Sequence, residues 1–327
     1  MNWNGTRVLV TGAGGFIGSH LTEKLVDMGA RTRALVHYRA DGSWGWLEHS
    51  PHKDKLEAIA GDINDRDSVL QAMRDVEIVF HLAALIAIPY SYHAPLSYVR
   101  TNVEGTLNVL QAARELGVER VVHTSTSEVY GTARRVPIEE IHPLQAQSPY
   151  AATKIAADKL AEAFHLSYGL PVVTVRPFNA FGPRQSSRAV VPTIITQCLN
   201  GGVVRLGNVD PTRDLSYVTD IVEGFVRAAA SPAAIGLTIN IGSGREISIR
   251  DLVSVIGRLL GRSIVIETEE RRVRPEKSEV ERLLADNSVS REMLGWAPRV
   301  SLEEGLQLTI EWIKEHLNGY RPGAYVV

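Results

Sequence analysis

The chain has 327 residues, of which 44% are hydrophobic and 22% are charged, and its formal net charge is -2. This composition is ordinary for a globular protein, and the near balance of charge argues against a nucleic-acid partner. The one cysteine, Cys198, cannot form an internal disulfide, which fits a reducing compartment. No apolar run reaches the roughly 18 residues that predict a membrane span, and the polar residues 1–7 lead into a strand rather than a signal peptide. We therefore expect a cytoplasmic protein without a membrane partner.

Short β-branched runs alternate with longer amphipathic stretches through the first 180 residues or so. This alternation is typical of a parallel sheet that helices cover on both faces. The predicted fold class is therefore α/β, a doubly wound parallel sheet of the Rossmann type. Strands are predicted at residues 7–11, 33–37, 56–61, 78–82, 120–125 and 172–177, and helices at 16–28, 65–73, 103–116 and 149–168.

The pattern changes after residue 177, where glycine and proline become frequent. A helix at 218–230 and a strand at 238–241 are predicted to return to the sheet. Further helices are predicted at 249–260 and 302–317, and a strand at 263–267. We expect a dinucleotide-binding domain of residues 1–178 plus about 214–245. A smaller, discontinuous substrate domain would take about 179–213 plus 246–327.

Gly12, Gly15 and Gly18 recur every third residue in TGAGGFIG, residues 11–18, between the first strand and the first helix. A dinucleotide site needs such glycines for a tight turn, close approach of the backbone to the pyrophosphate, and close packing of helix on strand. An isolated glycine triplet is equally typical of an ordinary turn. The position of this one as the first strand-to-helix turn favours a cofactor.

The choice between NAD and NADP depends on the end of the second strand. An NAD enzyme usually has an acidic residue there that binds the ribose 2′-hydroxyl, but residues 35–39 read LVHYR. His37 and Arg39 could instead accommodate a 2′-phosphate. We expect NAD, and NADP stays open as the alternative. Asp62, after the third strand, has the position of an adenine-contacting residue or of a helix N-cap.

The segment SPYAATK, residues 148–154, begins with a capping serine followed by proline, which is typical of a helix start. Tyr150 and Lys154 are four residues apart and share one helix face. We expect the ammonium to lower the pKa of the tyrosine and make it usable as a base. A surface tyrosine and lysine on an ordinary helix is the alternative.

The segment STSEVYG, residues 125–131, follows a predicted parallel strand at its carboxyl end, where ligands bind in open α/β sheets. Thr126 can form a hydrogen bond with a substrate hydroxyl beside Tyr150. Glu128 brings a carboxylate to the same place, and a solvated loop acid is its alternative role.

Together these motifs resemble those of extended short-chain dehydrogenase/reductases of the NAD-dependent epimerase/dehydratase type, over almost the whole chain. The shared motifs are TGAGGFIG (11–18), HLAA (81–84), TNVEGT (101–106), STSEVYG (125–131), SPYAATK (148–154), RPFNAFGPRQ (176–185), RDLSYVTD (213–220) and NIGSG (240–244).

The resemblance implies a role for each matching residue. Tyr150 would take the proton of the sugar 4-hydroxyl, Thr126 would bind that hydroxyl, and Lys154 would hold the nicotinamide ribose. The cofactor-binding residues would be Gly12, Gly15, Phe16, Ile17, Gly18, His37, Arg39, Asp62, Ile63, Leu82, Ala83, Ala84, Asn102 and Lys154. The substrate-binding residues would be Ser127, Asn179, Arg184, Arg213, Asn240 and Arg274. No metal site is expected, because the histidines lack ligand spacing and there is one cysteine.

The acid after Thr126 favours dehydration. Once C4 is a ketone, the C5 proton is acidic, and Glu128 can remove it and assist loss of the C6 hydroxyl. Dehydratases of the dTDP-glucose type carry Asp-Glu here, whereas this chain has Ser127-Glu128, so Glu128 would serve both steps. The Thr-Ser-Glu triplet is similar to that of GDP-mannose 4,6-dehydratases and of UDP-glucuronate decarboxylases.

The overall match is nearest to the dehydratases of legionaminic-acid biosynthesis, through SWGWLE (43–48) and RPFNAFGPRQSSRAVVPTIITQ (176–197). The sequence therefore predicts a nucleotide-sugar 4,6-dehydratase acting on a UDP- or GDP-linked N-acetylglucosamine. The alternatives are a 4-epimerase, a UDP-glucuronate decarboxylase, and a catalytically silent nucleotide-binding protein. The resemblance also implies a homodimer. Trp44 and Trp46 could rim the cofactor or pack at an interface.

Overall fold

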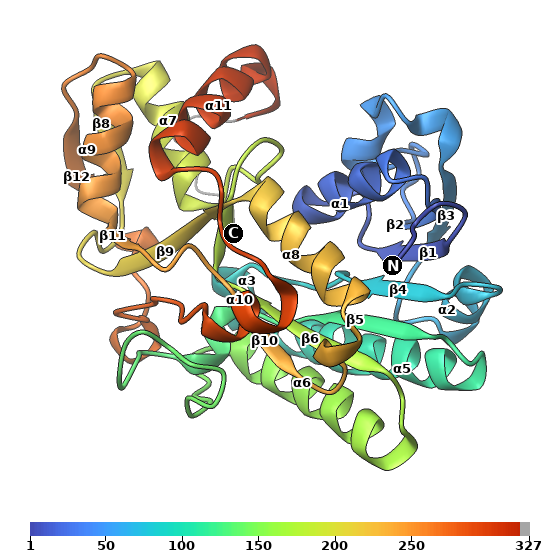
Figure 1. Ribbon diagram of the computed structural model, residues 1–327. Coiled ribbons are helices and arrows are strands. Elements are labelled where there is room, and N and C mark those ends of the chain that lie inside the picture. The colour runs from blue at the N-terminus through green and yellow to red at the C-terminus, as the bar shows by residue number, and fades with distance from the viewer. Residues whose placement is uncertain (321–327) are drawn as a thin grey trace.

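The computed structural model describes residues 1–320, and its centre is a seven-stranded parallel sheet (Figure 1). The strand order β10-β6-β5-β4-β1-β2-β3 reverses beside β1, which confirms the predicted doubly wound α/β fold. All of these strands except the edge strand β3 are buried over most of their length, because helices cover both faces of the sheet. The strands are β1 (Arg7–Thr11), β2 (Arg31–His37), β3 (Glu57–Gly61), β4 (Ile78–His81), β5 (Arg120–Thr124), β6 (Val172–Pro177) and β10 (Thr238–Ile241).

Helices cover the sheet on both faces, as the predicted alternation of strands and helices requires. Figure 1 shows α1 (Phe16–Asp27) and α8 (Val218–Ala230) together on one face. The opposite face carries α2 (Arg66–Met73), α5 (Gly105–Glu115) and α6 (Pro149–Tyr168). None of the helices within residues 1–320 has the length and apolarity needed to cross a bilayer.

Two small sheets lie outside the main one. One is three-stranded with the order β11-β9-β7, and the other pairs β12 with β8 in parallel. Their strands are β7 (Asn179–Phe181), β8 (Val203–Leu206), β9 (Thr212–Tyr217), β11 (Glu246–Ser248) and β12 (Val265–Thr268). The accompanying helices are α7 (Val190–Asn200), α9 (Ile249–Leu259), α10 (Ser288–Leu294) and α11 (Leu302–Glu315).

The division into two domains stays a proposal. The β10 strand joins the main sheet beside β6, whereas the boundary proposed at about residue 214 falls within β9 of a small sheet. Residues 321–327 of the second proposed domain lie outside the described residues.

The stretch between β4 and α5 is more helical than the sequence analysis predicted. It contains α3 (Ile88–His93), α4 (Pro95–Tyr98) and a π-helical turn, Val99–Glu104. Proline stands in the first turn of both short helices, where its missing N–H costs nothing. These elements form one side of the site described next.

Candidate active site

One cleft of about 1090 Å³ opens at the carboxyl ends of the main strands. Its lining comes from the glycine loop, from the loops after β2, β4, β5 and β6, and from residues 206–215 and 271–279. Ligand sites commonly measure about 300–1000 Å³, so this cleft has room for a cofactor together with a second ligand. We call the side formed by residues 12–18 and 82–84 the cofactor wall, and the side formed by Asn179, Arg213, Arg274 and Glu279 the substrate wall.

The glycine loop has the geometry that a dinucleotide requires. A β-carbon on Gly18 would lie 2.2 Å from the Gly12 carbonyl oxygen, so only glycine allows this contact between helix and loop. Gly15 is the N-cap of α1 and no side chain caps the helix, while Phe16 and Ile17 line the cleft. The positive end of the helix therefore faces the cleft and fits the negative charge of a pyrophosphate.

Thr11 and His81 hold the other part of the cofactor wall in place. The Thr11 Oγ1 atom accepts hydrogen bonds from the backbone N–H groups of Leu82 and Ala83, each at 3.1 Å. It also lies 2.9 Å from His81 Nδ1. Burial lowers the pKa of His81 well below its ordinary value, so the ring is neutral and Nδ1 can accept from the threonine hydroxyl. This arrangement fixes the backbone that lines the cleft.

The end of β2 carries an ion pair. His37 and Arg39 both line the cleft, as the sequence analysis expected of cofactor-binding residues. However, Arg39 Nη2 lies 3.1 Å from Asp41 Oδ2. A carboxylate therefore does stand beside this edge, two residues beyond Arg39, and it offsets the positive charge that would attract a 2′-phosphate.

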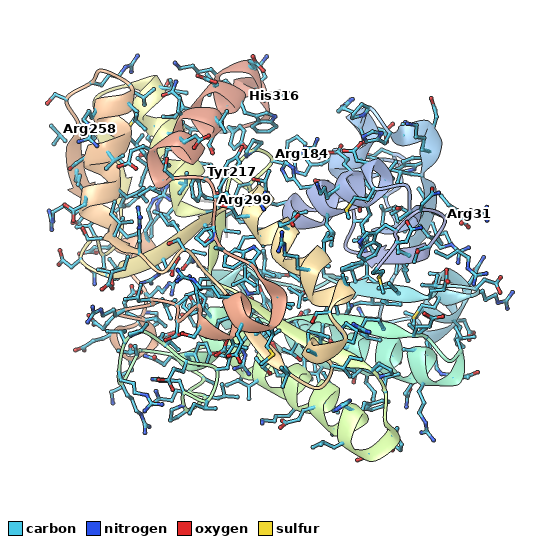
Figure 2. The ribbon with its side chains drawn as sticks, viewed as in Figure 1. Arg31, Arg184, Tyr217, Arg258, Arg299 and His316 are labelled. Atoms are coloured by element: carbon cyan, nitrogen blue, oxygen red, sulfur yellow. The ribbon has the colours of Figure 1, made fainter. Side chains whose placement is uncertain are left out.

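The loop after β2 places Trp44 and Trp46 in different surroundings. Trp44 lines the cleft, whereas the Trp46 ring packs edge-to-face against Trp312 of α11 with centroids 5.3 Å apart. Trp312 in turn stacks on His316, which Figure 2 labels at the end of that helix. Trp46 thus joins the cofactor side of the molecule to α11.

Thr126, Glu128 and Tyr150 line the cleft together, as the motifs implied. Thr126 lies two residues beyond the end of β5, and its Oγ1 accepts a hydrogen bond from the Glu128 backbone N–H at 3.2 Å. Tyr150 lies in the first turn of α6, where the Ser148 hydroxyl caps the helix by accepting from the Ala151 N–H at 3.1 Å. The predicted helix start is confirmed, and it places the phenol of Tyr150 in hydrogen-bonding contact with Thr126.

Lys154 does not lower the pKa of Tyr150 in this structure, contrary to the expectation from their spacing. Burial raises the pKa of Tyr150, the hydrogen bond with Thr126 opposes that rise, and the charge of Glu128 adds to it. The Lys154 ammonium donates to the Thr124 carbonyl oxygen at 2.6 Å and is not part of the cleft lining. Burial lowers the pKa of Lys154 to about 8, against the opposing charge of Asp158. Burial therefore outweighs the local charge at both residues.

The substrate wall is a set of paired charges. Arg274 Nη1 lies 3.9 Å from Glu128 Oε2 and 3.7 Å from Glu279 Oε1, and Arg213 Nη2 donates to the same Glu279 oxygen at 3.3 Å. The predicted residues Ser127, Asn179, Arg213 and Arg274 all line the cleft here. Glu279 was missed by the sequence analysis, and its only signal was its closeness to Arg274 in the chain.

Three buried oxygen atoms at the cleft need partners. Thr124 Oγ1, Asn179 Oδ1 and Gln185 Oε1 have no hydrogen-bond partner within residues 1–320, although all three residues line the cleft. A buried polar atom without a partner is costly. The three atoms therefore point to bound ligands at these positions.

Two predicted substrate-binding residues lie outside the cleft lining. Arg184 makes a double ion pair with Glu23 of α1, at 2.9 and 3.1 Å, and its side chain lies beside that helix in Figure 2. Asn240 is fully buried in β10, where its Nδ2 donates to the Ile138 carbonyl at 2.9 Å and its Oδ1 accepts from Tyr130 at 2.7 Å. Because other protein groups occupy their polar atoms, the predicted contacts of these two residues with substrate have no geometric support.

Four predicted cofactor-binding residues are also outside the lining: Lys154, described above, and Asp62, Ile63 and Asn102. The Asp62 side chain accepts a hydrogen bond from the Asn64 N–H at 2.9 Å. Its alternative role as a helix N-cap was wrong, because Asp65 is the N-cap of α2. Asn102, in the π-helical turn, binds both backbone groups of Leu85 and so supports the loop after β4 from behind. Ile63 is buried. Within the described residues, no three histidine, cysteine or acidic side chains are grouped to hold a metal ion.

Comparisons with known proteins show the family to which the chain belongs. The family model described as GDP-mannose 4,6 dehydratase matches residues 9–309. The chain is 37% identical to a UDP-glucose 4-epimerase of Mycolicibacterium smegmatis over 314 residues, 94% of this chain and 98% of the relative. It is 34% identical to a dTDP-glucose 4,6-dehydratase of Streptomyces griseus over 97% of both chains.

A solved structure shows the same fold. It is a dTDP-glucose 4,6-dehydratase of Streptomyces venezuelae with NAD bound, with a TM-score of 0.87 and 31% identity. The match covers 97% of this chain and 99% of that one. The chain therefore belongs to the GDP-mannose 4,6-dehydratase family of nucleotide-sugar dehydratases and epimerases, within the extended short-chain dehydrogenase/reductases.

Proposed function

We propose that the protein is an NAD-dependent nucleotide-sugar 4,6-dehydratase. The observation that carries this proposal is the position of Glu128, a carboxylate that lines the cleft together with Thr126 and Tyr150. Oxidation of the sugar at C4 needs Thr126 and Tyr150. Removal of water from C5 and C6 needs an additional acid or base within reach of the same sugar.

The cofactor wall fits NAD. Bound there, NAD would supply the hydride acceptor for C4, the hydride returned to C6, and a positively charged ring near Tyr150. Arg39 is paired with Asp41, which favours NAD over NADP, and the related dehydratase structure holds NAD. The uncapped N-terminus of α1 would bind the pyrophosphate.

Tyr150 and Thr126 would act on the 4-hydroxyl of the sugar. Thr126 orients that hydroxyl, and Tyr150 accepts its proton as C4 is oxidised. Burial keeps the phenol protonated in the ligand-free cleft. Nearby positive charge favours the phenolate, so the base forms only when the cleft is filled.

Glu128 would carry out both halves of the elimination. Its carboxylate removes the C5 proton, which the C4 ketone has made acidic. The C6–O bond then breaks, and the protonated Glu128 returns the proton to the departing hydroxyl so that water leaves. When hydride is returned to C6, C5 takes up a proton, which balances the proton that Tyr150 accepted from the 4-hydroxyl. Ser127 stands where dehydratases of the dTDP-glucose type carry a second acid, so Glu128 would have to serve both steps.

Arg213 and Arg274 support a substrate that carries a diphosphate, because guanidinium groups bind phosphate oxygens with paired N–H donors. We propose a UDP- or GDP-linked N-acetylglucosamine, which rests on resemblance rather than on geometry. A cytoplasmic homodimer is proposed on the same basis, with Leu116 and Leu166 of the α5 and α6 regions exposed in the described chain. Light scattering of the purified protein tests the dimer.

A 4-epimerase is the second candidate, favoured by the 37% identical relative. It would use Thr126 and Tyr150 in the same way but would not need Glu128. The two candidates differ in product mass, because epimerisation leaves the mass unchanged and dehydration removes one water.

The test is to incubate the protein with UDP-N-acetylglucosamine, GDP-N-acetylglucosamine, GDP-mannose and dTDP-glucose, and to record product masses. We expect one of them to lose the mass of water. Glu128→Gln should reduce that loss by about 10²- to 10⁴-fold, whereas Glu276→Gln, an exposed acid outside the cleft lining, should not. A mass-neutral product that Glu128→Gln still forms identifies an epimerase instead.

A further inference from the structure

Glu279 occupies the arginine groups that a diphosphate would need. Its Oε1 accepts a hydrogen bond from Arg213 Nη2 at 3.3 Å and lies 3.7 Å from Arg274 Nη1. Arg274 Nη1 has no hydrogen-bond partner within residues 1–320. It lies between the carboxylates of Glu279 and Glu128, within 4 Å of each.

The four side chains form a balanced and largely buried set of charges. Their side-chain exposures are 9% for Arg213, 25% for Arg274, 13% for Glu279 and 11% for Glu128. Burial lowers the pKa of Arg213, and the charges of Glu128 and Glu279 oppose that change. A buried cation without a counter-charge is strongly destabilising, so Glu279 stabilises the arginine pair when no other anion is present.

A diphosphate brings its own negative charge to the same N–H groups. Arg213 Nη1 already donates to the Thr212 carbonyl oxygen at 2.9 Å, so Nη2 is the donor that faces Glu279. A phosphate oxygen that binds the Nη2 hydrogen facing Glu279 takes the place of the Glu279 carboxylate. Otherwise two anions would share one donor at close range, which is unfavourable in a site of low dielectric.

We propose that Glu279 is a competing anion that sets the affinity of the cleft for nucleoside diphosphates. In the ligand-free enzyme, Glu279 pairs with Arg213 and Arg274. When the diphosphate binds, Arg213 pairs with a phosphate oxygen instead of Glu279, and when the diphosphate is released, Arg213 pairs with Glu279 again. The proposal rests on the proposed function, because it assumes that the substrate carries a diphosphate.

The backbone around Glu279 is anchored, so the exchange takes place by a rotation of the side chain, which also releases the hydrogen bond that Glu279 Oε1 accepts from the Val280 N–H at 3.2 Å. The Glu279 carbonyl oxygen accepts from Gln147 Nε2 at 3.0 Å and from Thr132 Oγ1 at 3.4 Å. The next residue, Val280, is 1% exposed. Substitution of the Glu279 side chain should therefore leave the fold of this segment intact.

The experiment measures binding of UDP, GDP and dTDP to the full-length protein by calorimetry. Glu279→Gln keeps the shape of the side chain and removes its charge. We expect it to bind the preferred diphosphate about tenfold more tightly, or about 1.4 kcal/mol. Glu281→Gln is the matched control, because Glu281 is exposed and outside the cleft lining, and its affinity should stay within about twofold of wild type. Glu279→Asp, which keeps the charge on a shorter side chain, should show a smaller gain.

Melting temperatures give a second measure. Without ligand, Glu279→Gln should melt below wild type, and a diphosphate should raise its melting temperature more than it raises that of wild type. Unchanged or weaker diphosphate binding by both Glu279 variants overturns the role of Glu279 alone. An equal gain in Glu281→Gln also overturns it, because the effect would then be one of overall charge. Failure of wild type to bind any of the three diphosphates overturns the proposed substrate class, and the role of Glu279 with it.

Discussion

The two walls of the cleft consist of different kinds of chemical group. The cofactor wall consists of backbone N–H groups, glycines, alanines and the apolar side chains of Phe16, Ile17 and Leu82, held by one helix N-terminus and one buried hydroxyl. The substrate wall consists of charged side chains that come from distant parts of the chain and neutralise one another. The first wall is rigid at Gly12, Gly14 and Gly18, because a β-carbon at any of them would lie within 3 Å of another backbone atom. The second wall can change its partners because Arg274 and Glu279 each lie within ion-pair distance of two opposite charges.

The largest expected effect comes from Tyr150, which lies at the cleft without belonging to either wall. Tyr150→Phe removes the hydroxyl that accepts the substrate proton and leaves both walls unchanged. Turnover should fall about 10³-fold, while the content of bound cofactor and the affinity for diphosphate stay the same. The control is Tyr168→Phe, an exposed tyrosine at the other end of the same helix. Retained turnover in Tyr150→Phe contradicts the assigned role.

Gly18→Ala tests the rigidity of the cofactor wall. The new methyl group would lie 2.2 Å from the Gly12 carbonyl oxygen, and such overpacking costs about 1–3 kcal/mol. The affinity for NAD should therefore fall by roughly 10- to 100-fold, as calorimetry can measure, without a comparable loss in diphosphate affinity. Gly201→Ala, where no atom lies within 4 Å of the added carbon, is the control. An equal loss of both ligands would show that the two walls are not independent.

The charge of Lys154, buried behind the cleft, can be tested through stability. Its pKa is about 8 in the folded protein against an ordinary 10.5, so the unfolded chain binds the extra proton between these values. Stability contributed by this group therefore rises with pH, by at most about 1.4 kcal/mol per pH unit.

The difference in free energy of unfolding, wild type minus Lys154→Met, should increase from pH 8 to pH 10. Urea unfolding at each pH measures it, and taking the difference cancels the groups that both proteins share. A flat or falling difference would mean that Lys154 stays charged through this range.

The smallest expected effect concerns the ion pair between Arg39 and Asp41, on the cofactor side of the cleft. Asp41→Ala frees Arg39 from its ion pair and should raise the affinity for NADP relative to NAD by about threefold, the scale of a surface charge. Asp54→Ala removes an exposed acid outside the cleft lining and should leave the ratio unchanged. If Asp41→Ala leaves the ratio of NADP affinity to NAD affinity unchanged, Arg39 has no part in the choice of cofactor.

The cofactor wall was largely predictable, because its signals are contiguous. The three glycines lie within seven residues, and the alternation of apolar runs places them where β1 leads into α1. The Ser148 cap likewise depends on residues three positions apart. Local sequence determines local geometry of this kind.

The substrate wall was predictable only by resemblance. Arg213 and Glu279 are 66 residues apart in sequence, and only the packing of the small sheets brings them together. The direction of the Lys154 ammonium, towards the Thr124 carbonyl rather than Tyr150, depends on burial that spacing does not reveal. The short helices α3 and α4 were missed because six and four residues are too few to show a helical period.

The contact between the glycine loop and the loop after β2 has an evolutionary consequence. A β-carbon on Gly14 would lie 2.4 Å from the Trp44 carbonyl oxygen, and one on Gly45 would lie 2.5 Å from the Gly14 carbonyl oxygen. Neither glycine can change while the other backbone stays where it is. The two positions should therefore drift as a pair, so that homologous chains with a side chain at position 14 also differ in the length or path of the second loop.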